Sequence, residues 1–92
     1  MTKPVFIDVR EPFEYSRGHV EGAINIPPAK IMDGAAEIKD LPKDTPLVLY
    51  CISGSRSNMS AAFLQQLGFT DITNGVNRQR VESEYAEFLS KS

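Results

Sequence analysis

The sequence predicts an α/β fold with a central, mainly parallel sheet flanked by helices. Short apolar runs rich in β-branched residues alternate with helix-like segments along the chain, which is typical of parallel sheets. The 92 residues suffice for one compact core and are too few for two. Neither an internal repeat nor a low-complexity linker divides them, so we expect one domain over residues 1–92.

The first half of the chain predicts two strands and two helical segments. Residues 4–9 are an apolar run that indicates a buried strand. Residues 12–18 begin with proline and end with glycine, as a short helix does. Residues 23–26 are extended, and two prolines end them. Residues 29–41 predict a weak helix interrupted at an Asp-Gly pair, and residues 42–46 predict a turn.

The next segment predicts a strand, a sharp turn and a helix. Residues 47–50 form the cleanest strand of the sequence. A helix over residues 58–67 follows, and Gly68 ends it. Apolar side chains at spacings of three and four predict the buried face of this helix. They are Met59, Ala62, Phe63 and Leu67.

The last part of the chain predicts a strand, a turn and a terminal helix. Residues 69–73 indicate a short strand, and the dipeptide Asn74-Gly75 indicates a turn. Helical spacing then places four apolar residues on one face: Val81, Tyr85, Phe88 and Leu89. We interpret Phe63, Tyr85 and Phe88 as core residues and not as a binding surface.

Composition narrows the partners and the compartment. Ten basic and twelve acidic residues give a net charge of -2, so we expect neither nucleic acid nor membrane as a partner. No apolar stretch approaches the roughly 20 residues of a membrane span. The segment Met1–Pro4 lacks the apolar run of a signal peptide. This favours a cytoplasmic location and leaves a periplasmic one open, if a leader has been removed.

The single cysteine lies in the stretch YCISGSRSN, between the cleanest strand and the helix. Cys51 follows the strand, at the carboxyl end where ligands collect in open α/β sheets. The helix begins near Ser57 or Asn58, and its first amides favour an anion. Gly54 lets backbone amides converge, and Arg56 adds a positive charge.

These features predict that Cys51 is a nucleophile with a lowered pKa. A thiol with a pKa of about 8.5 is about 3% ionised at neutral pH. Lowering the pKa by ~2 units makes about three quarters of it thiolate. The alternative is an inert structural cysteine buried in the core.

The spacing within the turn indicates which chemistry the thiolate performs. Four residues separate Cys51 from Arg56, whereas tyrosine phosphatases have five, which would place the arginine at Ser57. A shorter loop encloses less space, which favours a small bound group such as a single sulfur atom on the cysteine. A phosphatase or arsenate reductase remains the less favoured enzyme.

Two stretches resemble the single-domain rhodaneses, which are thiosulfate sulfurtransferases. CISGSRS, residues 51–57, is similar to the family pattern Cys-x-x-Gly-x-Arg-[Ser/Thr]. DVREPFEYSRGHVEGAINIP, residues 8–27, is similar to the family's N-terminal signature. The resemblance implies a rhodanese-like fold, with a central parallel sheet flanked by helices.

The resemblance also implies a ping-pong reaction through a Cys51 persulfide. A small sulfur-containing anion such as thiosulfate, or a persulfide, would donate the sulfur, and cyanide or a thiol, including a protein thiol, would accept it. The substrate-binding group would comprise loop amides and the arginine charge: Ile52, Ser53, Gly54, Ser55 and Arg56. Neither a metal nor an organic cofactor is implied, and we expect a monomer.

Asp8 and Arg10 are weaker candidates at the same edge of the sheet. Asp8 either fixes the loop or has a structural role, in an ion pair or as a cap for the helix near Pro12, and the structural role is favoured. Arg10 is also a candidate for attracting an anionic donor. We expect Glu14 in the same structural network, and the single histidine, His19, to be structural within the family signature.

The chain departs from the family pattern after residue 73. Many members carry Gly-Gly-x-x-x-Trp, but this stretch has one glycine and no tryptophan. Arg78 and Arg80 could add positive charge there, although we favour solvated residues at a helix start. The departure and the lack of a second basic residue in the loop support a different function class, a rhodanese-like module that binds a partner with weak or no catalysis.

Overall fold

The computed structural model describes residues 3–89, so Met1 and Thr2, which begin the segment without a signal-like run, lie outside the described residues. The elements in chain order are β1 (Val5–Asp8), α1 (Pro12–Ser16), β2 (Ile24–Asn25), α2 (Pro28–Met32), η1 (Ala36–Ile38), β3 (Leu47–Cys51), α3 (Ser55–Gln66), β4 (Ile72–Asn77), α4 (Arg78–Glu84) and η2 (Ala86–Phe88).

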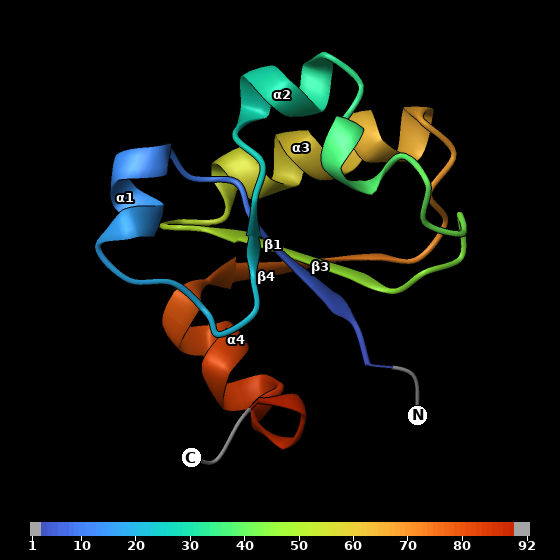
Figure 1. The fold of residues 1–92 in the computed structure, drawn as a ribbon. Coiled ribbons are helices and arrows are strands. Elements are labelled where there is room, and N and C mark those ends of the chain that lie inside the picture. Colours follow the sequence, from blue (N-terminus) through green and yellow to red (C-terminus); the bar gives the residue numbers. More distant parts are fainter. Residues whose placement is uncertain (1–2, 90–92) are drawn as a thin grey trace.

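The predicted α/β class with a central parallel sheet is confirmed. Four strands form the sheet in the order β2-β1-β3-β4, and each neighbouring pair is parallel. Helices α2 and α3 cover one face and α4 covers the other (Figure 1). Every residue of β3 is buried, because a strand covered on both faces has no solvent side. Among residues 3–89, no helix is both long and apolar enough to cross a membrane.

Alternate residues of the central strands feed two separate cores, as the strand period of two requires. The core beneath α2 and α3 is mostly aliphatic and consists of Ile7, Val9, Ile26, Ile31, Ala35, Ile38, Leu47, Leu49, Cys51, Leu64 and Phe69. The core beneath α4 is more aromatic and consists of Phe6, Val20, Ala23, Val48, Tyr50 and Val81, with Tyr15, Tyr85, Phe88 and Leu89 packed against it. Cys51 is thus the last residue of a strand whose side chains contribute to both cores.

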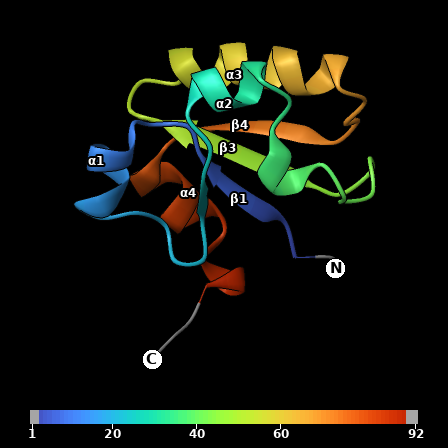
Figure 2. The same cartoon turned by 45° about the horizontal axis from the view of Figure 1, so that its top comes forward.

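The parallel register gathers chemically useful residues at one edge of the sheet. Asp8 of β1 lies opposite Tyr50 of β3, and Cys51 lies opposite Asn77 of β4. Helix α1 sits beside this edge, close to where β3 ends, in both views (Figures 1 and 2). The carboxyl end of the sheet is therefore the place where α1, the cysteine turn and β4 meet.

The prediction for α3 was wrong in its start and its buried face. The helix begins at Ser55 rather than near Ser57 or Asn58. Its fully buried residues are Ser57, Ser60 and Leu64, whereas Met59 and Leu67 are 64% and 40% exposed. The small serines on the inner face let the helix approach the sheet closely. The larger apolar residues, whose spacing led to the prediction, therefore lie mostly on the outer face. Ala62 is also exposed, and of the predicted face Phe63 alone packs partly against the core.

The prediction of a turn at Asn74-Gly75 was also wrong, since both residues lie inside β4. Leu49 pairs with Asn74 and Tyr50 with Val76, so Gly75 is an extra residue in the ladder, a β-bulge. A Cβ at Gly75 would lie 2.5 Å from Val81 Cγ2 and 3.1 Å from the carbonyl oxygen of Leu49. Close backbone approach, and not a turn, requires this glycine.

The remaining elements follow the predictions with small shifts. The weak helix over residues 29–41 is split into α2 and η1 by a break at residues 33–35. The strand predicted over residues 69–73 starts at Ile72, although Phe69 is buried in the core. The terminal helix ends at Glu84 and continues as η2, and its predicted apolar face packs against the core as expected.

Candidate active site

The candidate nucleophile, Cys51, is the last residue of β3 and is 2% exposed. A tight loop carries the chain from it into α3. Gly54 caps this helix with a φ of +95°, a conformation that costs a residue with a side chain more than it costs glycine. In that conformation the Gly54 amide donates a hydrogen bond to Cys51 Sγ at 3.1 Å. The loop thus points the N–H dipole of the Gly54 amide at the sulfur.

Ser57, in the first turn of α3, provides a second polar contact to the sulfur. Its Oγ lies 3.5 Å from Cys51 Sγ. Burial raises the pKa of the Cys51 thiol, but hydrogen bonds from the Ser57 side chain and from the amides of Ser57, Gly54 and Ser53 outweigh it and lower the pKa to about 7. A thiol with that pKa is about half ionised at neutral pH. These hydrogen bonds favour the thiolate, whereas 2% exposure is a feature of the structural alternative, so Cys51 as a nucleophile stays a prediction.

The predicted loop residues occupy different positions around the sulfur. Gly54 points its amide at Cys51, as described above, whereas Ile52 is 59% exposed. Ser53 and Ser55 are exposed, and their hydroxyl oxygens lie 3.3 Å apart. Their side chains therefore face solvent, and binding of a substrate by this loop stays a prediction.

Arg56 makes a two-pronged ion pair with Glu14 of α1. Nη1 lies 2.8 Å from Oε1, and Nη2 lies 3.2 Å from Oε2. The hydrogen bond from Arg56 is the main cause that lowers the pKa of Glu14 to about 2, and the amide of Glu11 adds to it. Glu14 likewise raises the pKa of Arg56. Glu14 therefore holds the cysteine loop to α1, rather than joining the network around Asp8.

Asp8 and Arg10 form an ion pair, in agreement with the structural role favoured from the sequence. Arg10 Nη2 lies 2.6 Å from Asp8 Oδ2 and donates to the carbonyl oxygen of Gly18 at 2.7 Å. The Tyr50 hydroxyl donates to Asp8 Oδ2 at 2.9 Å and accepts the amide of Val20. Burial raises the pKa of Tyr50 far above its ordinary value, so the hydroxyl keeps its proton. This network joins β1 to β3 beside the cysteine.

His19 lies against α1 and serves a structural contact. Its ring stacks on Tyr15 with centroids 3.7 Å apart, and its Nδ1 lies 2.9 Å from the carbonyl oxygen of Tyr15. The Tyr15 hydroxyl in turn donates to the carbonyl oxygen of Ala23. These contacts agree with the structural role expected for His19.

Asn74 begins the stretch where the resemblance implies the pocket wall beside the loop, but no role was predicted for it. Its Oδ1 accepts the Ser57 hydroxyl at 2.6 Å and the Val76 amide at 3.0 Å, and its Nδ2 donates to the carbonyl oxygen of Gly54 at 3.0 Å. Asn74 thus positions both residues that contact the sulfur. The Asn-Gly pair had the signature of a turn, and no local signal marked it as a neighbour of the cysteine.

Val76 completes the wall behind the loop, where the family's second glycine and tryptophan are absent. Its φ is +76°, which is strained for a β-branched residue. A Cβ on Gly54 would lie 3.3 Å from Val76 Cγ1. The bulge in β4 therefore brings Asn74 and Val76 together against the loop.

The two arginines that follow β4 pair with carboxylates of their own helix. Arg78 and Arg80 pair with Glu82 and Glu84, respectively, one turn along α4. All four side chains are 40% exposed or more. This agrees with their interpretation as solvated residues at a helix start.

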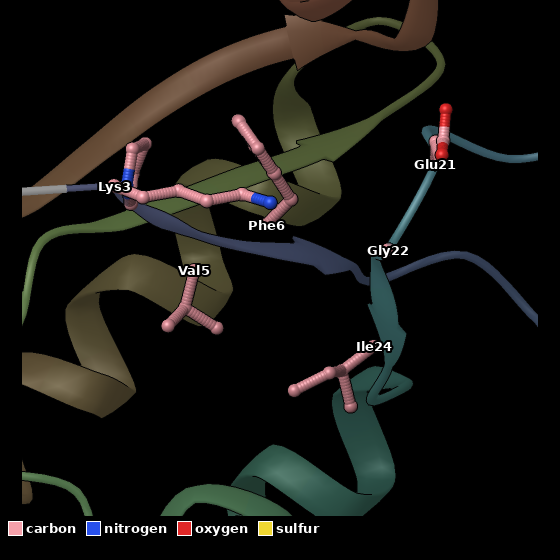
Figure 3. A pocket seen from close by; sticks show the side chains of 7 residues that line it. Lys3, Val5, Phe6, Glu21, Gly22 and Ile24 are labelled. Atoms are coloured by element: carbon pink, nitrogen blue, oxygen red, sulfur yellow. The ribbon is translucent and has the colours of Figure 1, made fainter. Parts of the chain in front are cut away.

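A hollow at the other end of the sheet is separate from the thiol site. Figure 3 shows its lining side chains, among them Val5 of β1 and Ile24 of β2. Lys3 and Glu21 contribute charged groups of opposite sign, and no residue of the cysteine loop lines it. Among residues 3–89, no cluster of three or more His, Cys, Asp or Glu residues could hold a metal ion.

Comparisons with known proteins agree with this geometry. A family model described as "Rhodanese-like domain" matches residues 1–76. The uncharacterized protein YqhL of Bacillus subtilis (strain 168) is 42% identical over 72 residues, which are 78% of this chain and 55% of that protein. The thiosulfate sulfurtransferase PspE of Escherichia coli (strain K12) is 38% identical over 76 residues, which are 77% of this chain and 72% of that protein.

A solved structure shares the fold as well as the sequence. A rhodanese with anions from E. coli superimposes with a TM-score of 0.75 at 31% identity, over 85% of this chain and 91% of that chain. The predicted likeness of the fold to rhodanese is confirmed. The chain spans only 55% of YqhL, so the activity of the whole protein is a matter of proposal.

Proposed function

Because the chain belongs to the rhodanese-like domain family, we propose that it is a sulfurtransferase that carries a sulfur atom on Cys51. One observation supports this most directly. Cys51 Sγ lies at the carboxyl end of β3 and accepts the Gly54 amide at 3.1 Å, in surroundings that lower its pKa to about 7. A thiolate at neutral pH needs no separate general base to attack a sulfur atom.

The first half-reaction loads the cysteine. The Cys51 thiolate attacks the outer sulfur of the donor and forms an S–S bond to it. The bond between that sulfur and the rest of the donor breaks, and its electron pair leaves with the rest. Thiosulfate would release sulfite, and a persulfide would release a thiolate. No oxidant or reductant is consumed.

The second half-reaction unloads the persulfide. A cyanide ion or a thiolate attacks the outer sulfur, and Cys51 leaves again as a thiolate. The products are thiocyanate or a new persulfide. The Gly54 amide lies where it would stabilise the departing thiolate. The Ser57 hydroxyl, which donates to Asn74 Oδ1, would do the same once its proton turned to the sulfur. Because the chain has one cysteine, the acceptor must come from outside it.

An intact-mass measurement tests the proposal. The protein is incubated with thiosulfate or a persulfide, weighed, and then treated with cyanide. We expect a gain of one sulfur, about 32 Da, that cyanide removes as thiocyanate. The Cys51→Ser variant should show no gain. If no donor adds a sulfur to Cys51, the chain is not a sulfurtransferase.

A second candidate is a module that binds a partner protein with weak or no catalysis. Ile52, directly after the cysteine, is 59% exposed, and Arg56 is already paired with Glu14. Those features suit an apolar partner surface. The absence of sulfur loading would favour this candidate, and hydrolysis of a phosphate ester would favour a phosphatase instead.

A further inference from the structure

The cysteine loop contains one cation, and a carboxylate neutralises it. Arg56 and Glu14 make two hydrogen bonds, 2.8 and 3.2 Å long, which occupy one edge of the guanidinium and two of its five N–H donors. The Glu14 side chain is 17% exposed, so solvent screens the pair only in part. An anion that approached Arg56 would meet Glu14 as well. The loop is therefore poorly suited to a dianion.

The second arginine at this edge is neutralised more completely. Arg10 Nε and Nη2 both donate to the Asp8 carboxylate, and Nη2 also reaches the carbonyl oxygen of Gly18. The Arg10 side chain is 12% exposed. Arg10 therefore has neither the free charge nor the access needed to attract an anionic donor.

The depth of the sulfur adds a requirement on shape. Cys51 is 2% exposed, so a donor must extend its outer sulfur inward to reach Sγ. In thiosulfate the outer sulfur is bonded to a tetrahedral sulfonate with three oxygens. In a persulfide, R–S–SH, it is bonded to a divalent sulfur that carries only one other substituent, so this end of the molecule is narrow. The buried thiol therefore favours the slender donor.

Two exposed apolar side chains are sequence neighbours of Cys51 and of Glu14. Ile52 is 59% exposed and directly follows Cys51. Phe13 of α1, which directly precedes Glu14, is 61% exposed, and the Arg17 guanidinium lies 6.0 Å from its ring centroid. An apolar group next to the thiol, as Ile52 is, favours contact with an organic residue over contact with a strongly hydrated oxyanion. An organic persulfide presents such a residue, whereas thiosulfate does not.

We propose that the sulfur donor of this protein is an organic persulfide of low charge rather than thiosulfate, and that Glu14 sets this selectivity by neutralising Arg56. The inference rests on the proposed function. In the loading step the Cys51 thiolate bonds to the outer sulfur of R–S–SH, the R–S–SH sulfur–sulfur bond breaks, and RS⁻ leaves with the electron pair. The proton stays on the transferred sulfur or passes to water.

The test compares two donors on two variants. The rate of sulfur loading on Cys51 is measured by quenched intact mass with thiosulfate and with the persulfide of N-acetylcysteine amide, whose organic part is uncharged. Each rate is divided by the rate of the same donor with a free thiol, which removes intrinsic reactivity. For the unchanged protein we expect the persulfide to exceed thiosulfate by about tenfold or more after this correction.

Glu14→Gln should change the selectivity while preserving the helix start, because glutamine serves at this position of a capping box as glutamate does. Arg56 would then hold a free positive charge. We expect the ratio of thiosulfate to persulfide rates to rise by about fivefold to tenfold. Glu84→Gln is the matched control, since it removes the carboxylate from the exposed Arg80–Glu84 ion pair of α4. Its ratio should equal that of the unchanged protein.

The outcomes separate this inference from the proposed function. Loading by thiosulfate as fast as by the persulfide, or an unchanged ratio in Glu14→Gln, would overturn the assignment of the donor while leaving the sulfurtransferase intact. Failure of both donors to load Cys51 would overturn the proposed function and the inference with it. If the variant fails to fold, the dependence of the loading rate of the unchanged protein on ionic strength tests the inference instead. Thiosulfate loading of the unchanged protein should vary less than about twofold with ionic strength, and a steep fall would contradict neutralisation of Arg56.

Discussion

Two arginine–carboxylate pairs lie near the same edge of the sheet, and they differ in almost everything except chemistry. Asp8 and Arg10 are two residues apart, their side chains are 0% and 12% exposed, and Tyr50 joins them. Glu14 and Arg56 are 42 residues apart, and their side chains are 17% and 34% exposed. The first pair braces β1 against β3, whereas the second controls the charge beside the thiol.

The difference teaches that burial, and not the presence of an ion pair, decides what such a pair contributes. A buried charge that loses its partner is costly, because water cannot replace the partner. A partly exposed pair contributes less to stability, because water competes with it. We therefore expect substitutions in the first pair to act on folding, and substitutions in the second to act on substrate selectivity.

The largest expected effect is that of Asp8→Ala. The substitution leaves Arg10 without a carboxylate and the Tyr50 hydroxyl without its acceptor. We expect the free energy of unfolding to fall by about 3–5 kcal/mol, measured by urea denaturation. A loss below about 1 kcal/mol would show that the buried pair braces nothing and would remove the contrast with Glu14–Arg56.

Tyr50→Phe should have the next largest effect. The hydroxyl accepts the buried amide of Val20 and donates to Asp8 Oδ2, each at 2.9 Å. Its removal leaves a buried donor unsatisfied, which costs about 1–3 kcal/mol. Thermal unfolding measures the loss. An unchanged melting temperature would indicate that Asp8 and Arg10 act without the tyrosine.

Ser57→Ala should raise the pKa of Cys51 by about one unit, a change of about 1.4 kcal/mol. The reason is that neutral hydrogen bonds, led by that of Ser57, lower the pKa to about 7. The rate of alkylation by iodoacetamide against pH measures it. Ser53→Ala, which removes an exposed hydroxyl from the same loop, is the control and should leave the pKa near 7. An unchanged pKa in Ser57→Ala would assign the effect to the backbone amides of the loop instead.

The smallest expected effect on stability is that of Glu14→Gln. The pKa difference given below corresponds to at most about 3 kcal/mol at neutral pH, and solvent around the partly exposed Arg56 brings the expected loss to about 1–2 kcal/mol. Arg56 lowers the pKa of Glu14 to about 2 in the folded protein, from about 4.3 in an unfolded chain. A lowered pKa stabilises the fold above pH ~4.3, and the stabilisation is lost as the pH falls toward 2. The difference between Glu14→Gln and the unchanged protein should therefore vanish near pH 2. A difference that persists there would contradict an ionic origin.

The sequence predicted what depends on contiguous residues. Local chemistry is sufficient to place Cys51 at a strand end, Gly54 where the backbone turns sharply and its amides converge, and the short helix α1 after Pro12. The parallel order of the strands also followed, because apolar runs alternating with helices have few other ways to bury both faces of a sheet.

Residues brought together from distant parts of the chain could not be predicted. Asn74 contacts the cysteine loop only because Gly75 bulges β4, and an Asn-Gly pair has the same composition in a bulge as in a turn. The inner face of α3 carries Ser57 and Ser60, so the apolar pattern pointed to the wrong side. The partner of Arg56 depends on where α1 docks, and no local spacing specifies that position.

The meeting of α1, the loop and β4 around Cys51 makes the protein carry its own folding probe. The contacts that lower the pKa of the thiol exist only when these segments are assembled, and in an unfolded chain the pKa returns to about 8.5. With one cysteine in the chain, the pH at which the thiol becomes reactive reports on the native population without any added label. Denaturant titrations read through this midpoint would follow the edge of the sheet that carries Cys51, while circular dichroism follows the helices.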